Sequence, residues 1–171
     1  MSTGGKQYEW EFFLAHAGPD APAAERLYDL LSPHARVFLS SKSLSLGDLW
    51  DDALPRAQQS SLITVVLISP RTEQAWYQRE EIAAAVDLAR RSGQRVVPMY
   101  LGDATREEDV PYGLRRLHSA RITSEADLKK LSQDLLALAA KQAPIPGGAA
   151  PPSPAPGAPA PDFSKGVPVF L

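Results

Sequence analysis

The sequence predicts one α/β domain in which helices cover both faces of a parallel β-sheet. Apolar runs of strand length alternate with stretches of helical spacing as far as about Gln142, and this alternation is typical of parallel sheets. The run Leu62–Ile68 (LITVVLI) is apolar and β-branched, as expected for a central strand buried on both faces. A chain of 171 residues is long enough for such a domain with a real core.

Four further runs are predicted as strands, which gives a five-stranded sheet: Trp10–Ala15, Arg36–Leu39, Arg95–Leu101 and, as a minimal strand, Arg121–Thr123. Pro98 lies inside one of these runs. Because proline has no backbone N–H to donate to a ladder, we expect Pro98 at a sheet edge or a bulge rather than at a ladder centre.

Helical spacing predicts the segments between the strands. The expected helices are Pro19–Leu31, Asp48–Gln58, Glu73–Arg91 and Glu125–Lys141, with a short helical turn at Tyr112–Leu117. In the second helix, Leu49 is expected on the same side as Ala53, Leu54 and Ala57. Ligands of open parallel sheets bind beyond the carboxyl ends of the strands. The loops after Leu14, Leu39, Ile68 and Leu101 are therefore the expected site.

Composition excludes several classes of chemistry. The formal net charge of −2 favours neither nucleic acid nor an anionic membrane as partner. There is no cysteine, so disulfides, thiolate metal sites and cysteine nucleophiles are excluded. The three histidines lack the HExxH spacing of a zinc site, and we expect no metal and no cofactor. Without an apolar N-terminal segment or an apolar run near the ~18 residues of a membrane span, we expect a soluble cytoplasmic domain.

Composition also divides the chain. We expect an N-terminal tail over residues 1–8, a folded domain over 9–142, a Pro/Ala-rich linker over 143–162 and a C-terminal tail over 163–171. The linker contains eight prolines and almost nothing large to bury, which predicts an extended segment. Such a linker suggests that the domain is tethered to a sensor domain or protein.

Four pieces of the folded part resemble the Toll/interleukin-1-receptor (TIR) domain family, in its bacterial form. They match the first strand and its exit, the second strand with the BB loop and the next helix, the central strand, and a segment with an aromatic residue followed four residues later by glutamate. In this sequence they are FFLAHAGPD (Phe12–Asp20), Val37–Ser61, LITVVLISP (Leu62–Pro70) and AWYQREEI (Ala75–Ile82). The resemblance implies a flavodoxin-like strand order.

The resemblance also implies an activity, the cleavage of NAD⁺ between nicotinamide and ribose to give ADP-ribose or a cyclic form. By position, the catalytic glutamate falls on Glu80 and the aromatic on Trp76. These two share one helix face at i, i+4. A carboxylate can stabilise an oxocarbenium-like ribose, and an aromatic ring can stack on the pyridinium. The alternative is that Glu80 is a solvated glutamate near the start of the helix, favoured by the helix dipole. Its neighbour Glu81 is most easily confused with it, but lies about 100° further round the helix.

Further site residues follow only from the resemblance. It implies substrate contacts at His16, Ala17, Ser43 and Gly47. It also implies that the loop Lys42–Asp48 packs against the next subunit in homotypic assembly, through Leu44, Leu46 and Gly47. Leu44 and Leu46 are apolar residues in a loop that we expect to be exposed, which favours a partner surface.

The sequence departs from the family's pattern at the strand exits. The family often has serine and an aromatic residue after the first strand and aspartate after the second, where this chain has Ala15, His16 and Ser40. Some enzymatic members have basic residues where Ala17 and Gly18 lie here. These differences affect the expected substrate contacts and not Glu80.

Three other functions compete with NAD⁺ cleavage. A non-catalytic TIR adaptor would keep the fold and act only by self-association. A phosphoacceptor receiver needs an acidic pair and an aspartate after the third strand, whereas this chain offers Asp20 and then Ser69 and Pro70. A nucleotide-sugar or deoxyribosyl-transferring enzyme stays open. By analogy with similar bacterial domains, we expect an effector of antiphage defence.

Overall fold

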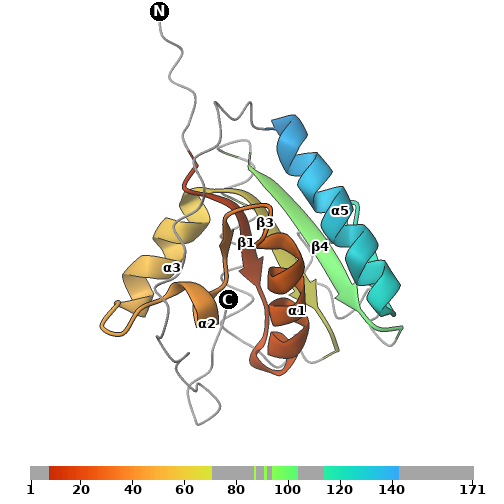
Figure 1. The fold of residues 1–171 in the computed structure, drawn as a ribbon, viewed down its shortest axis with the longest axis horizontal. Coiled ribbons are helices and arrows are strands. Elements are labelled where there is room, and N and C mark those ends of the chain that lie inside the picture. The colour runs from red at the N-terminus through yellow and green to blue at the C-terminus, as the bar shows by residue number, and fades with distance from the viewer. Residues whose placement is uncertain (1–7, 71–86, 88–90, 92–93, 104–113, 143–171) are drawn as a thin grey trace, which may run out of the picture.

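The computed structural model describes residues 8–70, 87, 91, 94–103 and 114–142. Within them, five strands form one parallel sheet in the order β2-β1-β3-β4-β5 (Figure 1). The strands are β1 (Trp10–Ala15), β2 (Val37–Phe38), β3 (Ser61–Ile68), β4 (Arg95–Leu101) and β5 (Ala120–Ile122). This arrangement confirms the predicted fold class and places the apolar run of β3 at the centre.

The described helices are η1 (Gly18–Asp20), α1 (Ala21–Leu31), α2 (Ser40–Ser43), α3 (Trp50–Gln59) and α5 (Glu125–Gln142). The helix expected over 73–91 lies outside the described residues except for Asp87 and Arg91, which are both helical. The turn expected over 112–117 is described from Leu114, whose carbonyl accepts from Leu117 N–H at 3.0 Å. No helix in the described ranges is long and apolar enough to cross a membrane.

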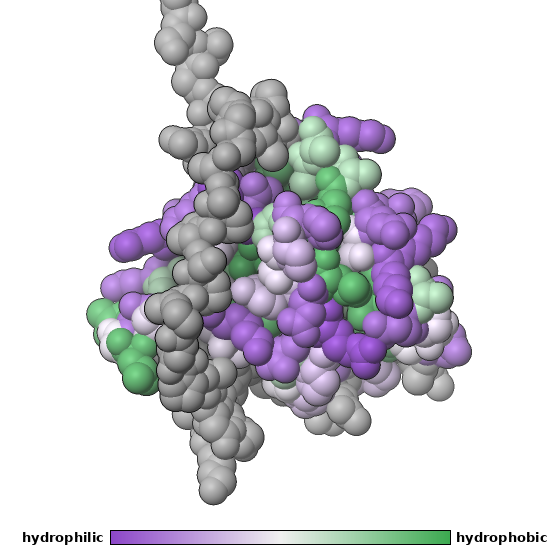
Figure 2. Space-filling model, viewed as in Figure 1, coloured by the Kyte–Doolittle hydropathy of each residue, from purple (hydrophilic) through white to green (hydrophobic). Residues whose placement is uncertain are grey.

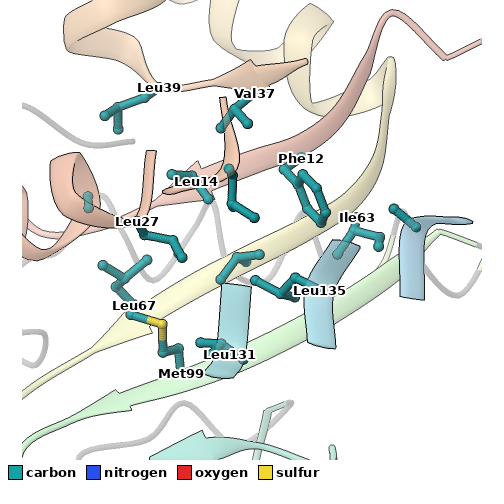
Figure 3. Close-up of a cluster of buried hydrophobic side chains, with 14 of the residues drawn as sticks. Phe12, Leu14, Leu27, Val37, Leu39, Ile63, Leu67, Met99, Leu131 and Leu135 are labelled. Atoms are coloured by element: carbon teal, nitrogen blue, oxygen red, sulfur yellow. The ribbon is translucent and has the colours of Figure 1, made fainter. Parts of the chain in front are cut away.

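The sheet buries two separate apolar layers because successive side chains of a strand point to opposite faces. On one face, side chains of β1 and β3 pack against α1 and α5, as Figure 3 shows for Phe12, Leu14, Ile63, Leu67, Leu27, Leu131 and Leu135. On the other face, alternate residues pack against α3 in a layer that contains Phe13, Ala15, Phe38, Leu54, Ala57, Val66 and Ile68.

The second strand is short, and its neighbours hold it by specific contacts. The Phe38 ring stacks on Phe13 with centroids 5.3 Å apart and meets Trp10 edge-on at 5.4 Å. At the start of β2, Glu11 accepts from the backbone N–H of Arg36 at 2.7 Å and pairs with its guanidinium at 3.0 Å. These contacts fix the strand that leads into α2 and the following loop.

Two details of the helices differ from the sequence prediction. The expected loop Lys42–Asp48 begins inside α2, so its first two residues are helical. The third helix begins at Trp50, and Leu49 precedes it as the N-cap residue with its side chain 71% exposed. The expectation that Leu49 shares the buried side of this helix is therefore wrong, because the cap residue has extended rather than helical backbone.

The expectation for Pro98 is also wrong as stated, because β4 lies between β3 and β5. Pro98 is paired with Val66 of β3. However, β5 pairs only with residues Met99 to Leu101 of β4. Pro98 thus lies just before the second ladder begins, where a missing N–H is tolerated.

Candidate functional site

Buried polar residues gather where the first three strands of the fold end. The parallel pairing of β1 with β2 and β3 brings these ends to one edge of the sheet. Four polar side chains there are almost inaccessible to solvent: His16, Asp20, Ser40 and Ser69. Because buried polar groups are costly unless they are bonded, each of these side chains needs a partner or a function.

Asp20 and Ser69 form a direct bridge across this edge. The Ser69 hydroxyl donates to Oδ2 of Asp20 at 2.7 Å. Asp20 ends η1, whose turn is closed by its backbone N–H donating to Ala17 O at 2.9 Å. The bond therefore ties the exit of β1 to the exit of β3. Neither residue was among the predicted contacts, although each follows an apolar strand at the edge where parallel sheets bind ligands.

His16 is held in one tautomer beside this bridge. Its Nδ1 lies 2.8 Å from the carbonyl of Ala17. Because a carbonyl can only accept, Nδ1 carries the proton and Nε2 presents a lone pair. Burial lowers the pKa of His16, against the opposing effects of that hydrogen bond and of Asp20 and Glu25. The ring is therefore neutral at pH 7 and can accept a hydrogen bond.

Two serines of α2 differ in their bonding. The Ser40 side chain is fully buried, and its Oγ has no hydrogen-bond partner among the described residues. The Ser43 hydroxyl accepts from Leu39 N–H at 3.1 Å, which ties α2 back to the end of β2. A hydroxyl without a partner is available to a ligand, whereas that of Ser43 supports the backbone; the substrate role of Ser43 stays a prediction.

The loop between α2 and α3 turns sharply and exposes apolar side chains. Gly47 has φ +94°, which favours glycine, and the turn is closed by Ser45 N–H donating to Asp48 Oδ2 at 2.7 Å. Leu46 is 91% exposed, and Figure 2 shows hydrophobic surface at the tip of this loop. Leu44, in contrast, is half-buried against the layer around Phe13, so its expected exposure is wrong.

The remaining predicted contacts are placed unevenly. Ala17 is fully buried, and its carbonyl accepts from His16 and from Asp20, so only its backbone faces this edge. Trp76, Glu80 and Glu81 lie outside the described residues. Across the part of the chain that the structure describes, no cluster of three or more His, Cys, Asp or Glu could hold a metal ion.

Among the described residues, the edge thus offers two uncharged polar side chains, His16 and Ser40, beside the carboxylate of Asp20. His16 supplies an acceptor and Ser40 a hydroxyl, and the Asp20–Ser69 bond holds the edge together. Such groups are suited to the hydroxyls and amides of a ribose-containing ligand.

Solved structures with the same fold include two receptors and a resistosome. The metazoan TIR-STING receptor from C. gigas, in complex with 2′,3′-cGAMP, is similar with a TM-score of 0.64 and 19% identity over 78% of this chain and 40% of that one. The TIR domains of the activated Roq1 resistosome, which directly recognizes the pathogen effector XopQ, are similar with a TM-score of 0.53 and 19% identity. The match covers 79% of this chain and 86% of that one. The TIR domain of Toll-related receptor TRR-2 from Hydra magnipapillata is similar with a TM-score of 0.56 and 15% identity. The match covers 74% of this chain and 98% of that one.

These likenesses concern the fold, since each identity is below 25%. The chain spans less than half the length of the C. gigas receptors that it matches. A comparison with curated protein sequences gives no match. The sequence profile of the TIR domain family matches residues 12–136, which includes most of β1, all of the other four strands and most of α5. The chain therefore belongs to the TIR domain family.

Proposed function

We propose that this TIR domain is an NAD⁺ nucleosidase of the bacterial type. It cleaves the bond between nicotinamide and ribose and releases nicotinamide with ADP-ribose or its cyclic form. The observation that carries the proposal is the set of buried, uncharged polar groups at the carboxyl edge of a TIR sheet, above all His16 and Ser40. A domain that acted only by surface association would have no need to bury, at this edge, a hydroxyl without a partner among the described residues.

The reaction needs stabilisation of a ribosyl cation more than it needs an acid. The bond from C1′ to the pyridinium nitrogen breaks, and its electron pair leaves with neutral nicotinamide. Water then adds to C1′ and loses a proton to solvent, or a nucleophile of the same molecule closes a ring. In the proposal, the carboxylate of Glu80 stabilises the cation, as carboxylates do in glycoside cleavage, and Trp76 stacks on the leaving ring.

His16 and Ser40 orient the substrate in this proposal. The neutral Nε2 of His16 accepts from a ribose hydroxyl or from the carboxamide of nicotinamide. Ser40 Oγ gains the partner that it lacks among the described residues. The carbonyl of Ala17, Ser43 and the backbone near Gly47 are further contacts. NAD⁺ is the substrate, and no separate cofactor takes part.

The exposed loop supports activity through homotypic assembly. Leu46 at its tip is 91% exposed and Leu49 at its end is 71% exposed, and exposed leucines of this kind are suited to a partner surface. A second copy packed there would complete the site, so activity would rise on clustering. The linker 143–162 would tether the domain 9–142 to a sensor, as in a cytoplasmic defence effector; the rival is an adaptor that assembles without cleavage.

The decisive experiment is Glu80→Gln, which keeps size and removes charge. Loss of one preorganised electrostatic group commonly lowers turnover by ~10²–10³, or about 3–4 kcal/mol of barrier. We expect that loss in NAD⁺ cleavage by the concentrated protein, with identification of the product. Glu81→Gln is the matched control and should be far milder. The reverse pattern would show that the wrong glutamate was chosen. No cleavage by the wild type, even when clustered, would favour the adaptor.

Assembly is tested by Leu46→Asp. Because Leu46 is 91% exposed, its replacement should change the free energy of unfolding by less than ~0.5 kcal/mol. Self-association in analytical ultracentrifugation and turnover should fall together. Ala126→Asp, an exposed position in the first turn of α5, adds the same charge elsewhere and should leave both unchanged. Turnover per molecule that is independent of concentration would contradict the shared site.

A further inference from the structure

An apolar groove lies at the opposite end of β4 from the candidate site. It has a volume of about 700 Å³ and runs between the first half of β4, the turn before β5 and one side of α5. Its apolar lining is Val97, Leu117, Leu131, Leu135 and Leu138. Arg95 and Asp134 also line it, and both are exposed.

The groove is open because β5 is short. Pairing between β4 and β5 begins only at Met99, so the residues of β4 before Pro98 have no β5 residue beside them. The turn that precedes β5 forms the other wall, through Leu117, His118 and Ser119. As a result Val97 and Leu138 stay half-buried and Leu117 is 37% exposed. A groove of this kind accepts an extended apolar segment.

The chain leaves the described domain at the rim of this groove. The last residue of α5, Gln142, turns its amide oxygen toward the guanidinium of Arg95, whose Nη2 donates to it at 3.0 Å. Figure 1 shows α5 running beside β4 with its C-terminal end toward the beginning of that strand. Since Arg95 lines the groove, the segment that follows Gln142 begins next to it.

The segment Phe163–Leu171 has the composition that the groove requires. Its sequence, FSKGVPVFL, contains five large apolar side chains, one lysine and no acidic residue. Asp134 offers a carboxylate to Lys165, and the apolar lining offers contacts to residues such as Phe170. The twenty residues 143–162 lie between this segment and Gln142.

The linker length allows the segment to return. Twenty flexible residues have a root-mean-square span of about 25 Å, and a fully extended polyproline form reaches about 60 Å. A groove at the attachment point lies within either reach. A segment tethered in this way has an effective concentration in the millimolar range, so even weak apolar contacts keep it bound.

We propose that Phe163–Leu171 docks in this groove of its own domain. The C-terminal tail is then an internal ligand of the β4–α5 surface rather than a free extension. A partner that uses the tail must first displace it. This inference does not depend on the NAD⁺ reaction, because the groove lies away from the carboxyl edge of the sheet.

The absence of native cysteine allows a direct crosslinking test in the full chain. The pair Ser119→Cys and Ser164→Cys places one thiol in the groove wall and one in the tail. Disulfides form only when the Cα atoms approach to about 4.4–6.8 Å. Under mild oxidation of dilute protein, we expect an intramolecular disulfide, seen as a monomer of raised mobility on non-reducing gels and located by mass spectrometry.

The control pair, Ser45→Cys and Ser164→Cys, moves the first thiol to the exposed loop after α2. We expect it to crosslink at least fivefold more slowly. Adding Phe170→Asp to the groove pair should slow its crosslinking to the control rate, because a buried charge opposes docking. Equal rates for the two pairs would overturn the proposal. So would a disulfide found mainly in dimers, which would instead show that the groove binds a second copy.

Discussion

The two edges of the sheet both bury polar side chains, but they bond them in different ways. The amino edge, where the strands begin, buries Gln58, Ser61 and Gln94. The carboxyl edge, where they end, buries His16, Asp20, Ser40 and Ser69. Burial alone therefore does not distinguish a binding site from a structural joint, and the difference lies in what each polar group contacts.

At the amino edge the partners are backbone carbonyls close by. The amide of Gln94 donates to Gln59 O at 2.8 Å and to Ser61 O at 2.7 Å. The Ser61 hydroxyl donates to Ala57 O at 2.6 Å. These bonds join the end of α3 to the starts of β3 and β4 and leave neither donor to a ligand. The arrangement is that of a structural joint.

At the carboxyl edge the bonding is mixed. His16 bonds to the backbone carbonyl of Ala17, whereas the other partners are side chains, or none within the described ranges. Ser69 bonds to Asp20 across 49 positions of sequence, and Ser40 Oγ is unbonded in the described part. Within the described residues, Ser40 is thus the buried side chain of this edge whose hydroxyl is left without a bond. In the proposed function, the unbonded hydroxyl of Ser40, rather than polarity alone, distinguishes the candidate site from the structural joint.

The largest stability effect is expected at the amino edge. Gln94→Leu removes one donor from two carbonyls, and each buried group left without a bond costs about 1–3 kcal/mol. We expect the free energy of unfolding to fall by about 2–3 kcal/mol in urea titrations, with turnover per folded molecule unchanged. Gln59→Leu changes an exposed side chain and keeps the backbone carbonyl that accepts from Gln94. It should leave the free energy of unfolding nearly unchanged. A loss of turnover in folded Gln94→Leu protein would blur the distinction between the edges.

The sequence predicts most of this architecture because the central strand is buried on both faces. All eight residues of β3 are buried, so its apolar run needs no knowledge of its neighbours. The ends of the elements depend on backbone contacts instead. Residues 40–43 form a helical turn because the backbone N–H groups of Lys42 and Ser43 donate to Leu39 O, at 2.9 and 2.8 Å. A helix of only four residues is too short to show a hydrophobic periodicity in the sequence.

The candidate site was less predictable for a related reason. His16 was expected from the family resemblance, whereas the Asp20–Ser69 bond depends on how η1 places Asp20 opposite the end of β3. Contacts over such separations follow from strand order and not from local spacing. The burial of Leu44 and Leu49 was also predicted the wrong way round. Leu49 is exposed because α3 begins two residues later than expected, and Leu44 is half-buried because the chain turns back from α2 toward the layer around Phe13.

A matched pair of serine substitutions tests whether the two edges bond their buried hydroxyls differently. Ser61→Ala at the amino edge removes a buried hydroxyl with a 2.6 Å bond, and we expect a loss of about 1 kcal/mol in the free energy of unfolding. Ser40→Ala removes a buried hydroxyl that has no partner among the described residues. Relief of its desolvation should leave stability unchanged or raise it by up to about 1 kcal/mol.

The same pair separates stability from function. If Ser40 contacts substrate, Ser40→Ala should raise the KM for NAD⁺ while Ser61→Ala leaves it unchanged. Denaturant titration and initial-rate measurements on both variants provide the two readouts. Equal destabilisation by the two substitutions would mean that Ser40 is bonded as Ser61 is, and the contrast between the edges would lose its main support.

The smallest expected effect is a pH dependence of stability that belongs to the carboxyl edge. Burial lowers the pKa of His16 in the folded protein, against the hydrogen bond to Ala17 and the charges of Asp20 and Glu25. Between that folded pKa and the unfolded value near 6.5, the unfolded chain binds more protons. Stability therefore increases with pH across this window. It is full above about pH 7 and declines as the pH falls through 6.5 toward the folded pKa of His16.

His16→Asn isolates this contribution, because the asparagine amide can still donate to Ala17 O but cannot titrate. We expect the wild type to lose stability between pH 7.5 and 5.5 in urea titrations, and the variant to show a shallower slope over the same range. His34 and His118 are exposed and present in both proteins, so they cancel in the comparison. Identical slopes would show that His16 is not buried as a neutral ring, and the carboxyl edge would then lack the acceptor assigned to it.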